Sequence, residues 1–356
     1  MSDGGGHSRP LEQLRGADAA MFGGKSASLG ELIAAGIPVP PGFALSTSGF
    51  GAFVDEAGLA GRISAAVAEL PPDDLERVNA VSRAIAEGMR SAPVPESVRA
   101  EVGRRYAELS GEAEPPVAVR SSALGEDSQD ATFAGQQETY LWVRGADGVC
   151  DAVRDCWVSL YSPQAMTYRA RVGAGGATPA MGVTVQLMVD AAVSGVMFTC
   201  NPVSGDPSMV AVNASWGLGL AVVGGEVTPD DYLVSKVTSE VVRQTVTVKE
   251  IEYVPGAHGR GAVRVEVPPE RREAPCLDEE QLAALVALAR RVERHFGGHQ
   301  DIEWAIGHDG ELFVVQSRPV TAVAKPAGPP RQLTAISLVM SKFGATADDS
   351  GEPRAD

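Results

Sequence analysis

The sequence predicts an α+β protein of two lobes, and three observations support this. A chain of 356 residues is long enough to bury two hydrophobic cores. Residues 49 to about 109 are rich in alanine and interrupted by prolines, which is typical of successive short helices. Six strands are expected between residues 181 and 267, and those at 181–190, 241–249 and 262–267 alternate apolar and polar residues with a period of two, which predicts a mostly antiparallel sheet.

The composition argues against several classes of protein. The contents of hydrophobic residues, 44%, and of charged residues, 21%, are those of a soluble globular protein. A formal net charge of −16 argues against a nucleic-acid partner, but a nucleotide needs only a local positive pocket. The first ten residues form no apolar run, and no run approaches the ~18 residues of a membrane span. Neither a signal peptide nor a membrane partner is expected.

The cysteines indicate a reducing compartment. There are four, Cys150, Cys156, Cys200 and Cys276, and they show neither CxxC nor zinc-binding spacing. Reduced thiols in a cytoplasmic protein are the simplest expectation.

A short helix with a lysine at its start follows the N-terminus. Residues 1 to about 10 are expected to be disordered, and Ser26–Ala35 predicts a helix that ends at Gly36. Lys25 precedes it in a Gly-Gly-Lys-Ser segment that is similar to the end of a P-loop. That motif is rejected, because Ala19 stands where it needs glycine and no apolar strand precedes it. A lysine here can meet a phosphate or lie exposed to solvent.

A second candidate anion-binding segment lies at residues 117–136. Val117–Arg120 predicts a short buried strand that ends in an arginine, and a run of small and polar residues follows. Such a loop brings backbone N–H groups close to an anion, with the arginine as a further donor. The alternative is an acidic surface loop, which leaves the arginine at the strand end unexplained.

Further elements follow from periodicity and capping signals. A helical segment is expected at 151–171, with a buried side of Val153, Cys156, Trp157, Leu160 and Tyr161. Asp278–Phe296 predicts a long helix with a capping box between Asp278 and Gln281. Strands are expected at residues 181–190, 194–199, 210–214, 232–236, 241–249 and 262–267.

Residues 300–319 predict a hairpin. The Asp-Gly pair at 309–310 is a favoured two-residue loop, because both positions need positive φ. Counting back from this loop, Glu303 lies opposite Gln316 and Asp301 lies opposite Arg318. Side chains alternate along a strand, so these four share one face.

The two faces of this hairpin have different chemistry. The polar face holds two carboxylates, an amide and a guanidinium. Glu303 and Gln316 offer oxygens that suit Mg²⁺, and Arg318 suits a phosphate. The alternative is a solvated face with an Asp301–Arg318 ion pair. The other face is expected to join the core through Ile302, Trp304, Ile306, Phe313 and Val315.

Residues 22 to 321 contain, in order, the segments GGKSASLGEL, VAVRSSALGEDSQDATFAGQQETYL, SGVMFTCNPVSG, SWGLGLAVVGGEVTPDDY and QDIEWAIGHDGELFVVQSRPVT. These resemble the ATP-binding domain of phosphoenolpyruvate synthase, pyruvate phosphate dikinase and rifampin phosphotransferase. The resemblance implies an ATP-grasp fold with ATP between two lobes. The lobes are expected at residues 1–182 and 183–321, with a linker or docking tail at 322–356.

The resemblance also implies roles for single residues. Lys25 and Arg120 would hold ATP phosphates, and Arg318 would stabilise the transferring phosphoryl group; these three are the expected catalytic residues. Four further residues would complete the ATP site. Gly135 and Thr139 would line the phosphate and ribose side, and Gln186 and Met188 would meet adenine. Mg²⁺ would be bound by Glu303 and Gln316, with Asp301 as a further group near the metal.

Two departures from the family are visible. Leu220 stands where the Gly-Leu-Gly segment is usually followed by glutamate. The sequence has no Thr-(Cys/Ser)-His motif in a glycine-rich context, and its five histidines lie elsewhere. The resemblance therefore implies the ATP-binding subunit of a split phosphotransferase, whose partner chain carries a phosphorylatable histidine. The acceptor would be pyruvate, a phenol or another alcohol.

Two other functions remain open from the sequence. One is a stand-alone ligase or kinase that releases ADP, although no acceptor pocket is evident. The other is a regulatory module that binds a nucleotide without turnover, which the leucine at position 220 favours. A fold alone does not decide among them.

Overall fold

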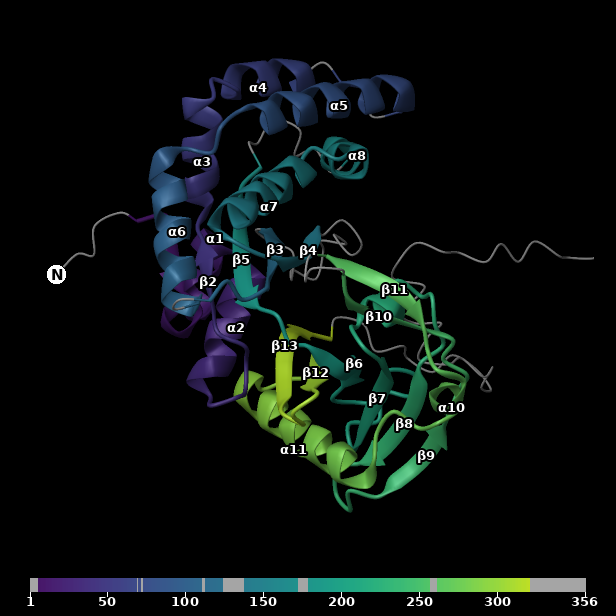
Figure 1. The fold of residues 1–356 in the computed structure, drawn as a ribbon. Helices are drawn as coiled ribbons and strands as arrows, with labels where there is room; N and C mark the ends of the chain where they lie inside the picture. The colour runs from purple at the N-terminus through teal and green to yellow at the C-terminus, as the bar shows by residue number, and fades with distance from the viewer. Residues whose placement is uncertain are drawn as a thin grey trace, which may run out of the picture.

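A computed structural model describes residues 6–68, 70–71, 73–110, 113–123, 138–171, 179–256 and 261–320. It contains two main sheets, each covered by helices, which lie one above the other in Figure 1. Within the described residues, no helix is both long enough and apolar enough to span a bilayer. The mixture of helices and sheets confirms the α+β class.

The N-terminal sheet has five strands in the order β1-β2-β5-β3-β4, all paired antiparallel. Its strands are β1 (Ser8–Pro10), β2 (Gly42–Leu45), β3 (Val117–Ala123), β4 (Thr139–Val143) and β5 (Met181–Leu187). The expectation of disorder up to residue 10 is wrong for Ser8–Pro10, because these residues pair with β2.

Helices pack around this sheet, and the first four of them lie in the alanine-rich segment, as predicted (Figure 1). They are α3 (Thr47–Glu56), α4 (Ala60–Ala68), α5 (Leu75–Ser91), α6 (Glu96–Ser110), α7 (Ala146–Ser159) and α8 (Pro163–Arg171). Trp157 is fully buried and stacks on Phe53 with ring centroids 5.2 Å apart. The five residues expected on the buried side of segment 151–171 are all buried.

The C-terminal sheet has six antiparallel strands in the order β13-β12-β6-β7-β8-β9. They are β6 (Ala191–Phe198), β7 (Met209–Trp216), β8 (Asp230–Ser235), β9 (Val241–Thr245), β12 (Gln300–Gly307) and β13 (Leu312–Pro319). A separate antiparallel ribbon joins β10 (Ile251–Pro255) to β11 (Ala262–Glu266). The antiparallel sheet is confirmed, although the sequence did not indicate β10.

The long helix is α11 (Glu279–Phe296), and its capping box is confirmed: Asp278 and Gln281 exchange side-chain-to-backbone hydrogen bonds. Two carboxylates in its first turn complement the helix dipole. The remaining short elements are η1 (Leu11–Gln13), η2 (Gly16–Asp18), α1 (Ala19–Phe22), α9 (Leu220–Val223) and α10 (Pro269–Arg272).

Helix α2 (Gly24–Ala34) joins the two lobes. It starts two residues earlier than expected, so Lys25 lies in its first turn. Leu29 and Leu32 pack in one buried cluster with Leu285 of α11 and Ile302 of β12. The N-terminal segment therefore contributes to the core of the C-terminal lobe. A boundary between residues 182 and 183 would cut β5, whose residues all pair in the N-terminal sheet, and we propose to place it after Leu187.

The hairpin β12–β13 pairs as predicted at the site, but its loop differs. The backbone N–H of Gly307 donates to the carbonyl of Glu311 at 2.9 Å, which closes a loop of three residues, 308–310, not two. A β-bulge then inserts Val315 into β13. The longer loop and the extra residue offset one another, so Glu303 still faces Gln316 and Asp301 still faces Arg318.

The bulge changes which residues of β13 reach the core. Val314, opposite Trp304, is fully buried in the core of the C-terminal lobe. The expectation that Phe313 and Val315 join this core face is wrong, because the inserted residue reverses the alternation between loop and site. Val315 lines a pocket between the lobes instead.

Candidate functional site

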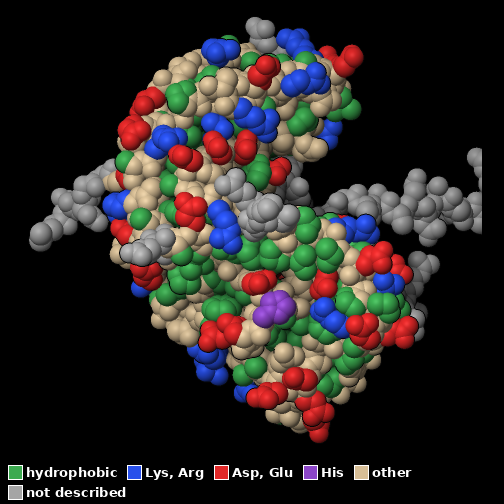
Figure 2. Space-filling model, viewed as in Figure 1, with side chains coloured by type: hydrophobic (Ala, Val, Ile, Leu, Met, Phe, Trp, Pro, Cys, Tyr) green, Lys and Arg blue, Asp and Glu red, His purple; other side chains and the backbone are tan. Residues whose placement is uncertain are grey.

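A pocket of about 510 Å³ lies between the two sheets. Strands β3, β4 and β5 supply one wall, and β6, β12, β13 and the segment around α9 supply the other. On the face seen in Figure 2, hydrophobic side chains form a band just below the junction of the lobes. A pocket of this size, with an apolar surface and a few convergent charged groups, suits a small organic ligand.

Arg120 connects the lobes across this pocket. It lies on β3, and its Nη2 donates to Glu303 Oε2 at 2.9 Å and to Gln316 Oε1 at 2.7 Å. Its Nη1 donates to the backbone carbonyl of Val315 at 2.9 Å. The side chain is 12% exposed, so these charge-assisted bonds lie in a partly desolvated site. The sequence did not indicate that the Val315 carbonyl would accept this bond, because the position of a bulge depends on tertiary pairing.

The expected metal ligands fit a divalent cation in type. A carboxylate oxygen of Glu303 and an amide oxygen of Gln316 converge on one point, which here holds the positive Nη2 of Arg120. Hard oxygens of this kind suit Mg²⁺ when phosphate oxygens complete the shell. The described residues hold no cluster of three or more histidine, cysteine or acidic side chains suited to a metal ion. Glu303 and Gln316 would thus supply two oxygens of such a coordination shell.

Arg318 and Asp301 form the ion pair that the sequence offered as an alternative. Nε and Nη2 of Arg318 both lie 2.9 Å from Oδ2 of Asp301. Arg318 lines the pocket, whereas Asp301 is 6% exposed and lies outside the lining. The carboxylate therefore orients the arginine, and its expected place beside the metal stays a prediction.

Lys25 is buried, so the solvent-exposed alternative is wrong. It is 6% exposed, and its Nζ donates to the backbone carbonyl of Ser121 at 3.0 Å. Gly23, just before α2, has φ of +82°, and a Cβ there would lie 2.1 Å from the Ser122 hydroxyl oxygen. Only glycine allows this close approach of helix and strand, which holds the lysine against the end of β3.

The residues expected at the adenine lie at the lobe junction. Gln186 is 2% exposed on β5, and its Nε2 donates to the carbonyl of Pro40 at 3.2 Å. Met188 follows that strand, and both residues line the pocket. Thr139 also lines it, opposite Arg120 in the β3–β4 pair. Gly135 lies outside the described residues.

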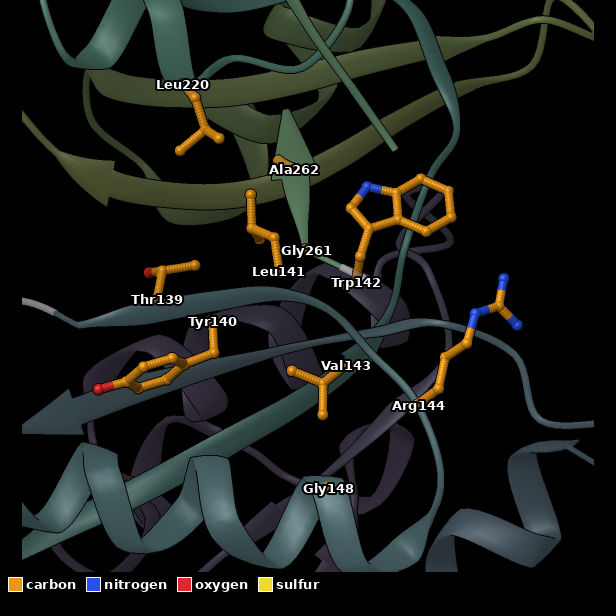
Figure 3. Close-up of a pocket in the computed structure, with 10 residues that line it drawn as sticks. All are labelled: Thr139, Tyr140, Leu141, Trp142, Val143, Arg144, Gly148, Leu220, Gly261 and Ala262. Carbon is orange, nitrogen blue, oxygen red and sulfur yellow. The ribbon is translucent and has the colours of Figure 1, made fainter. Parts of the chain in front are cut away.

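A second pocket of about 460 Å³ adjoins the first (Figure 3). The two share Thr139, Leu141 and Leu220, so the position of the missing glutamate borders both. Nothing in the sequence indicated Trp142, which adopts φ of +55° and is 5% exposed. Its carbonyl accepts a bond from the backbone N–H of Gly261 at 3.4 Å, which is a further contact between the lobes.

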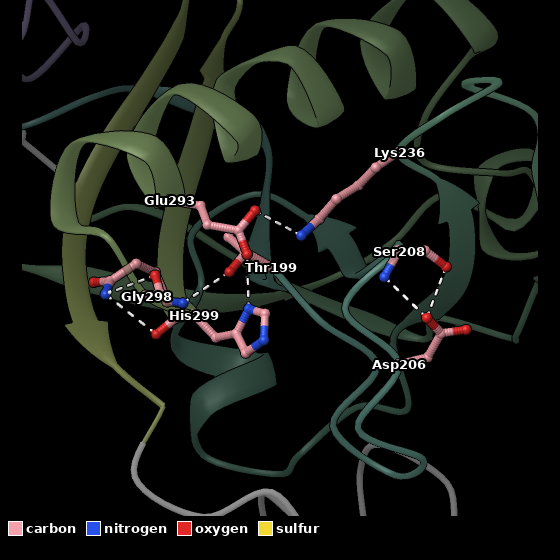
Figure 4. A network of polar contacts seen from close by, with 8 residues as sticks. Thr199, Asp206, Ser208, Lys236, Glu293, Gly298 and His299 are labelled. Carbon is pink, nitrogen blue, oxygen red and sulfur yellow. Dashed lines mark hydrogen bonds and ion pairs between the residues drawn. The ribbon is translucent and has the colours of Figure 1, made fainter.

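A polar network at the far end of α11 has a structural role (Figure 4). Glu293 lies 2.6 Å from Lys236 Nζ and 2.7 Å from His299 Nδ1. It ties α11 to the ends of β8 and β12.

The chain belongs to the family of the pyruvate phosphate dikinase, AMP/ATP-binding domain, whose model matches residues 19–333. It is 39% identical over 358 aligned residues to phosphoenolpyruvate synthase of Pyrococcus furiosus, covering 89% of this chain and 44% of the relative. It is 41% identical over 318 residues to a probable phosphoenolpyruvate synthase of Methanothermobacter thermautotrophicus, covering 88% and 46%. The chain spans less than half the length of these relatives. The predicted family is confirmed.

Among solved structures, the chain is similar to D-cycloserine synthetase DcsG. The TM-score is 0.23 and the sequence identity 14%, over 83% of this chain and 60% of the other. A likeness at this level carries no argument about the site.

Proposed function

We propose that this chain is the ATP-binding and ATP-cleaving part of a phosphotransferase of the phosphoenolpyruvate-synthase kind, with an ATP-grasp fold. Gln186 and Met188 would hold adenine at the lobe junction, with Thr139 and Gly135 along the ribose and phosphates. Lys25, Arg120 and Arg318 would hold the phosphates. The proposed substrate pair is ATP and a histidine outside these 356 residues.

One observation carries this proposal. In a chain of the AMP/ATP-binding family, cationic and oxygen-bearing side chains from both lobes meet in a single pocket. Arg120 of the N-terminal lobe contacts Glu303 and Gln316 of the C-terminal lobe directly. Phosphoryl transfer needs this type of site, because positioning and charge stabilisation do most of the work.

The proposed reaction converts ATP to AMP and phosphate. The terminal phosphoryl is lost to water as phosphate, and the β-phosphoryl passes to a histidine nitrogen, from which it reaches the final acceptor. Mg²⁺, held by Glu303 and Gln316, would neutralise phosphate charge. Arg120 and Lys25 would bind the phosphates, and Arg318, oriented by Asp301, would stabilise charge on the transferred group.

The receiving histidine is proposed to lie on a partner chain. None of the five histidines stands in a phosphorylation motif. His299, which directly precedes β12, already contacts Glu293. A partner would also supply the acceptor site for pyruvate, a phenol or another alcohol.

β-labelled ATP tests this proposal. The purified chain is incubated with Mg²⁺ and labelled ATP, alone and with a lysate of its source. We expect AMP and an acid-labile, base-stable label on a second polypeptide. The variant Glu303→Gln, which loses a carboxylate of the pocket, is expected to lower AMP formation about 100-fold or more.

Other outcomes would favour the alternatives. ADP as the product without a labelled protein would indicate a direct kinase or ligase. ATP bound tightly and never cleaved would indicate a regulatory nucleotide-binding module. Leu220 favours the second of these, because an apolar side chain borders both pockets at the position usually held by glutamate.

A further inference from the structure

A single nitrogen atom occupies the point on which the two expected metal-binding oxygens converge. Both N–H groups of Arg120 Nη2 are used, one by Glu303 Oε2 and one by Gln316 Oε1. A carboxylate and an amide oxygen that meet at one cation cannot hold a metal ion at the same point. Arginine binding and metal binding by this pair of oxygens are therefore mutually exclusive.

The arginine is anchored from the opposite side as well. Nη1 donates to the carbonyl of Val315, which the bulge frees from the regular ladder. Its Nε is buried and finds no acceptor among the described residues. A buried donor without an acceptor is unfavourable, because the hydrogen bond that it makes to water in the unfolded chain is not replaced. Arg120 would therefore gain from a new anionic partner.

We propose that Arg120 competes with the divalent metal ion for Glu303 and Gln316, and that the nucleotide decides the competition. This rests on the proposed function of the pocket. Phosphate oxygens offer the guanidinium a bidentate partner of higher charge than one carboxylate. When Arg120 turns to the phosphates, the two oxygens become available to the metal ion.

This exchange makes metal and nucleotide binding cooperative. The metal ion binds weakly alone, because it must displace a cation from both oxygens. The nucleotide removes that competitor, and linkage requires that the metal ion strengthen nucleotide binding by the same factor. The lobes are coupled too, because Arg120 belongs to the N-terminal sheet and both oxygens belong to the C-terminal hairpin.

Binding of Mn²⁺ alone, without nucleotide, tests the proposal, because the free ion is counted by its electron paramagnetic resonance signal. We compare the whole wild-type chain with Arg120→Met, which keeps the aliphatic stem and removes the cation. The variant is expected to bind one Mn²⁺ roughly tenfold or more tightly than the wild type, within the usual range of coupling between ligands. Adding Glu303→Gln to this variant should abolish the gain.

Two further variants control for a general loss of positive charge and for misfolding. Arg144→Met removes one positive charge beside the neighbouring pocket without touching either oxygen, and it should leave Mn²⁺ affinity unchanged. Arg120→Lys serves if Arg120→Met does not fold. The ammonium of lysine cannot reproduce the geometry in which the guanidinium donates to three acceptors. Arg120→Lys is therefore expected to increase Mn²⁺ affinity less than Arg120→Met does.

The outcomes separate this inference from the proposed function. If both Arg120 variants bind Mn²⁺ no more tightly than the wild type, the competition does not exist, even where the wild type forms AMP from ATP. An increase in Mn²⁺ affinity that persists after Glu303→Gln, or that Arg144→Met reproduces, would also overturn the proposed competition. The oxygens of Glu303 and Gln316 would then not be the source of the increase. Failure of the wild type to form AMP from ATP in the presence of the lysate overturns the proposed function instead.

Discussion

Two ion pairs in this molecule each join a basic side chain to a carboxylate, but they lie in different surroundings. Lys249 and Asp230 lie 2.6 Å apart inside the C-terminal lobe, and both side chains are 0% exposed. Arg120 and Glu303 lie 2.9 Å apart at the lobe junction, with side chains 12% and 26% exposed. The second pair borders the pocket between the lobes, whereas the first lies within the core of one lobe.

The remaining partners reinforce this difference. Asp230 also accepts backbone N–H bonds from Thr247 at 2.9 Å and from Cys276 at 2.8 Å. Both of its oxygens are therefore satisfied by fixed groups. Arg120 keeps one buried donor, Nε, for which the described residues provide no acceptor. A fully satisfied pair specifies structure, whereas an incompletely satisfied pair beside a pocket can exchange partners.

The largest expected effect is on stability, from Asp230→Asn. This change leaves the ammonium of Lys249 charged and buried without a carboxylate, which destabilises a protein by about 3–5 kcal/mol. Urea-induced unfolding followed by circular dichroism measures the loss. A loss below about 1 kcal/mol would show that the buried pair is not the structural element described here.

The thiol of Cys276 reports on the same region. Burial raises its pKa, and the nearby negative charge of Asp230 raises it further. Removing that charge by Asp230→Asn lowers the pKa, so the reactive thiolate fraction at pH 8 increases. Alkylation by iodoacetamide, measured by mass spectrometry, is expected to accelerate about tenfold or more as the region opens.

Cys150 is the internal reference for this labelling. Burial raises its pKa to about 11, and it lies on α7 in the other lobe. Its alkylation rate should change much less than that of Cys276. Equal acceleration of both thiols would mean that the whole chain opens, and would remove the argument for a local effect.

A smaller stability effect is expected at the lobe junction. Glu303→Gln removes a charge from a partly exposed pair, and the amide oxygen still accepts from Arg120. The free energy of unfolding should therefore change by no more than about 1 kcal/mol. Urea unfolding beside Asp230→Asn makes the comparison direct, and similar losses in the two variants would contradict the distinction between the pairs.

The smallest effect is expected at a surface pair. Arg243 lies 2.8 Å from Asp231, but its side chain is 56% exposed. Arg243→Met should change the unfolding free energy by about 0.5 kcal/mol or less, and added salt should remove the change. A larger or salt-resistant loss would place this pair with Lys249 and Asp230.

Local signals in the sequence determined much of the fold. The capping box at Asp278 and the apolar stripe behind it located α11 to within one residue, because both act within one turn. The cross-strand pairs at Glu303 and Asp301 were also correct. These pairs were predicted with a loop of two residues, one fewer than the structure has. The inserted Val315 compensates for the missing loop residue.

Long-range features could not be obtained in this way. The burial of Lys25 depends on the approach of β3, which lies some ninety residues later in the chain. The hydrogen bonds of Arg120 depend on the carbonyl of Val315 at the bulge and on the contact between the two sheets. Such contacts are set by tertiary packing, which neither propensity nor periodicity encodes.

The extra residue in β13 has a consequence for deletions. Removing one residue from a strand ordinarily turns every side chain beyond it to the opposite face. Val315 has no counterpart on β12, so its loss would restore a one-to-one count between the strands. Gln316 and Arg318 would keep their direction, and a carbonyl that links the lobes would be lost. Positions 314 and 315 are both valine, so deletion of either gives the same chain. This deletion is a milder change than deletion of Gln316, which would remove a side chain of the pocket.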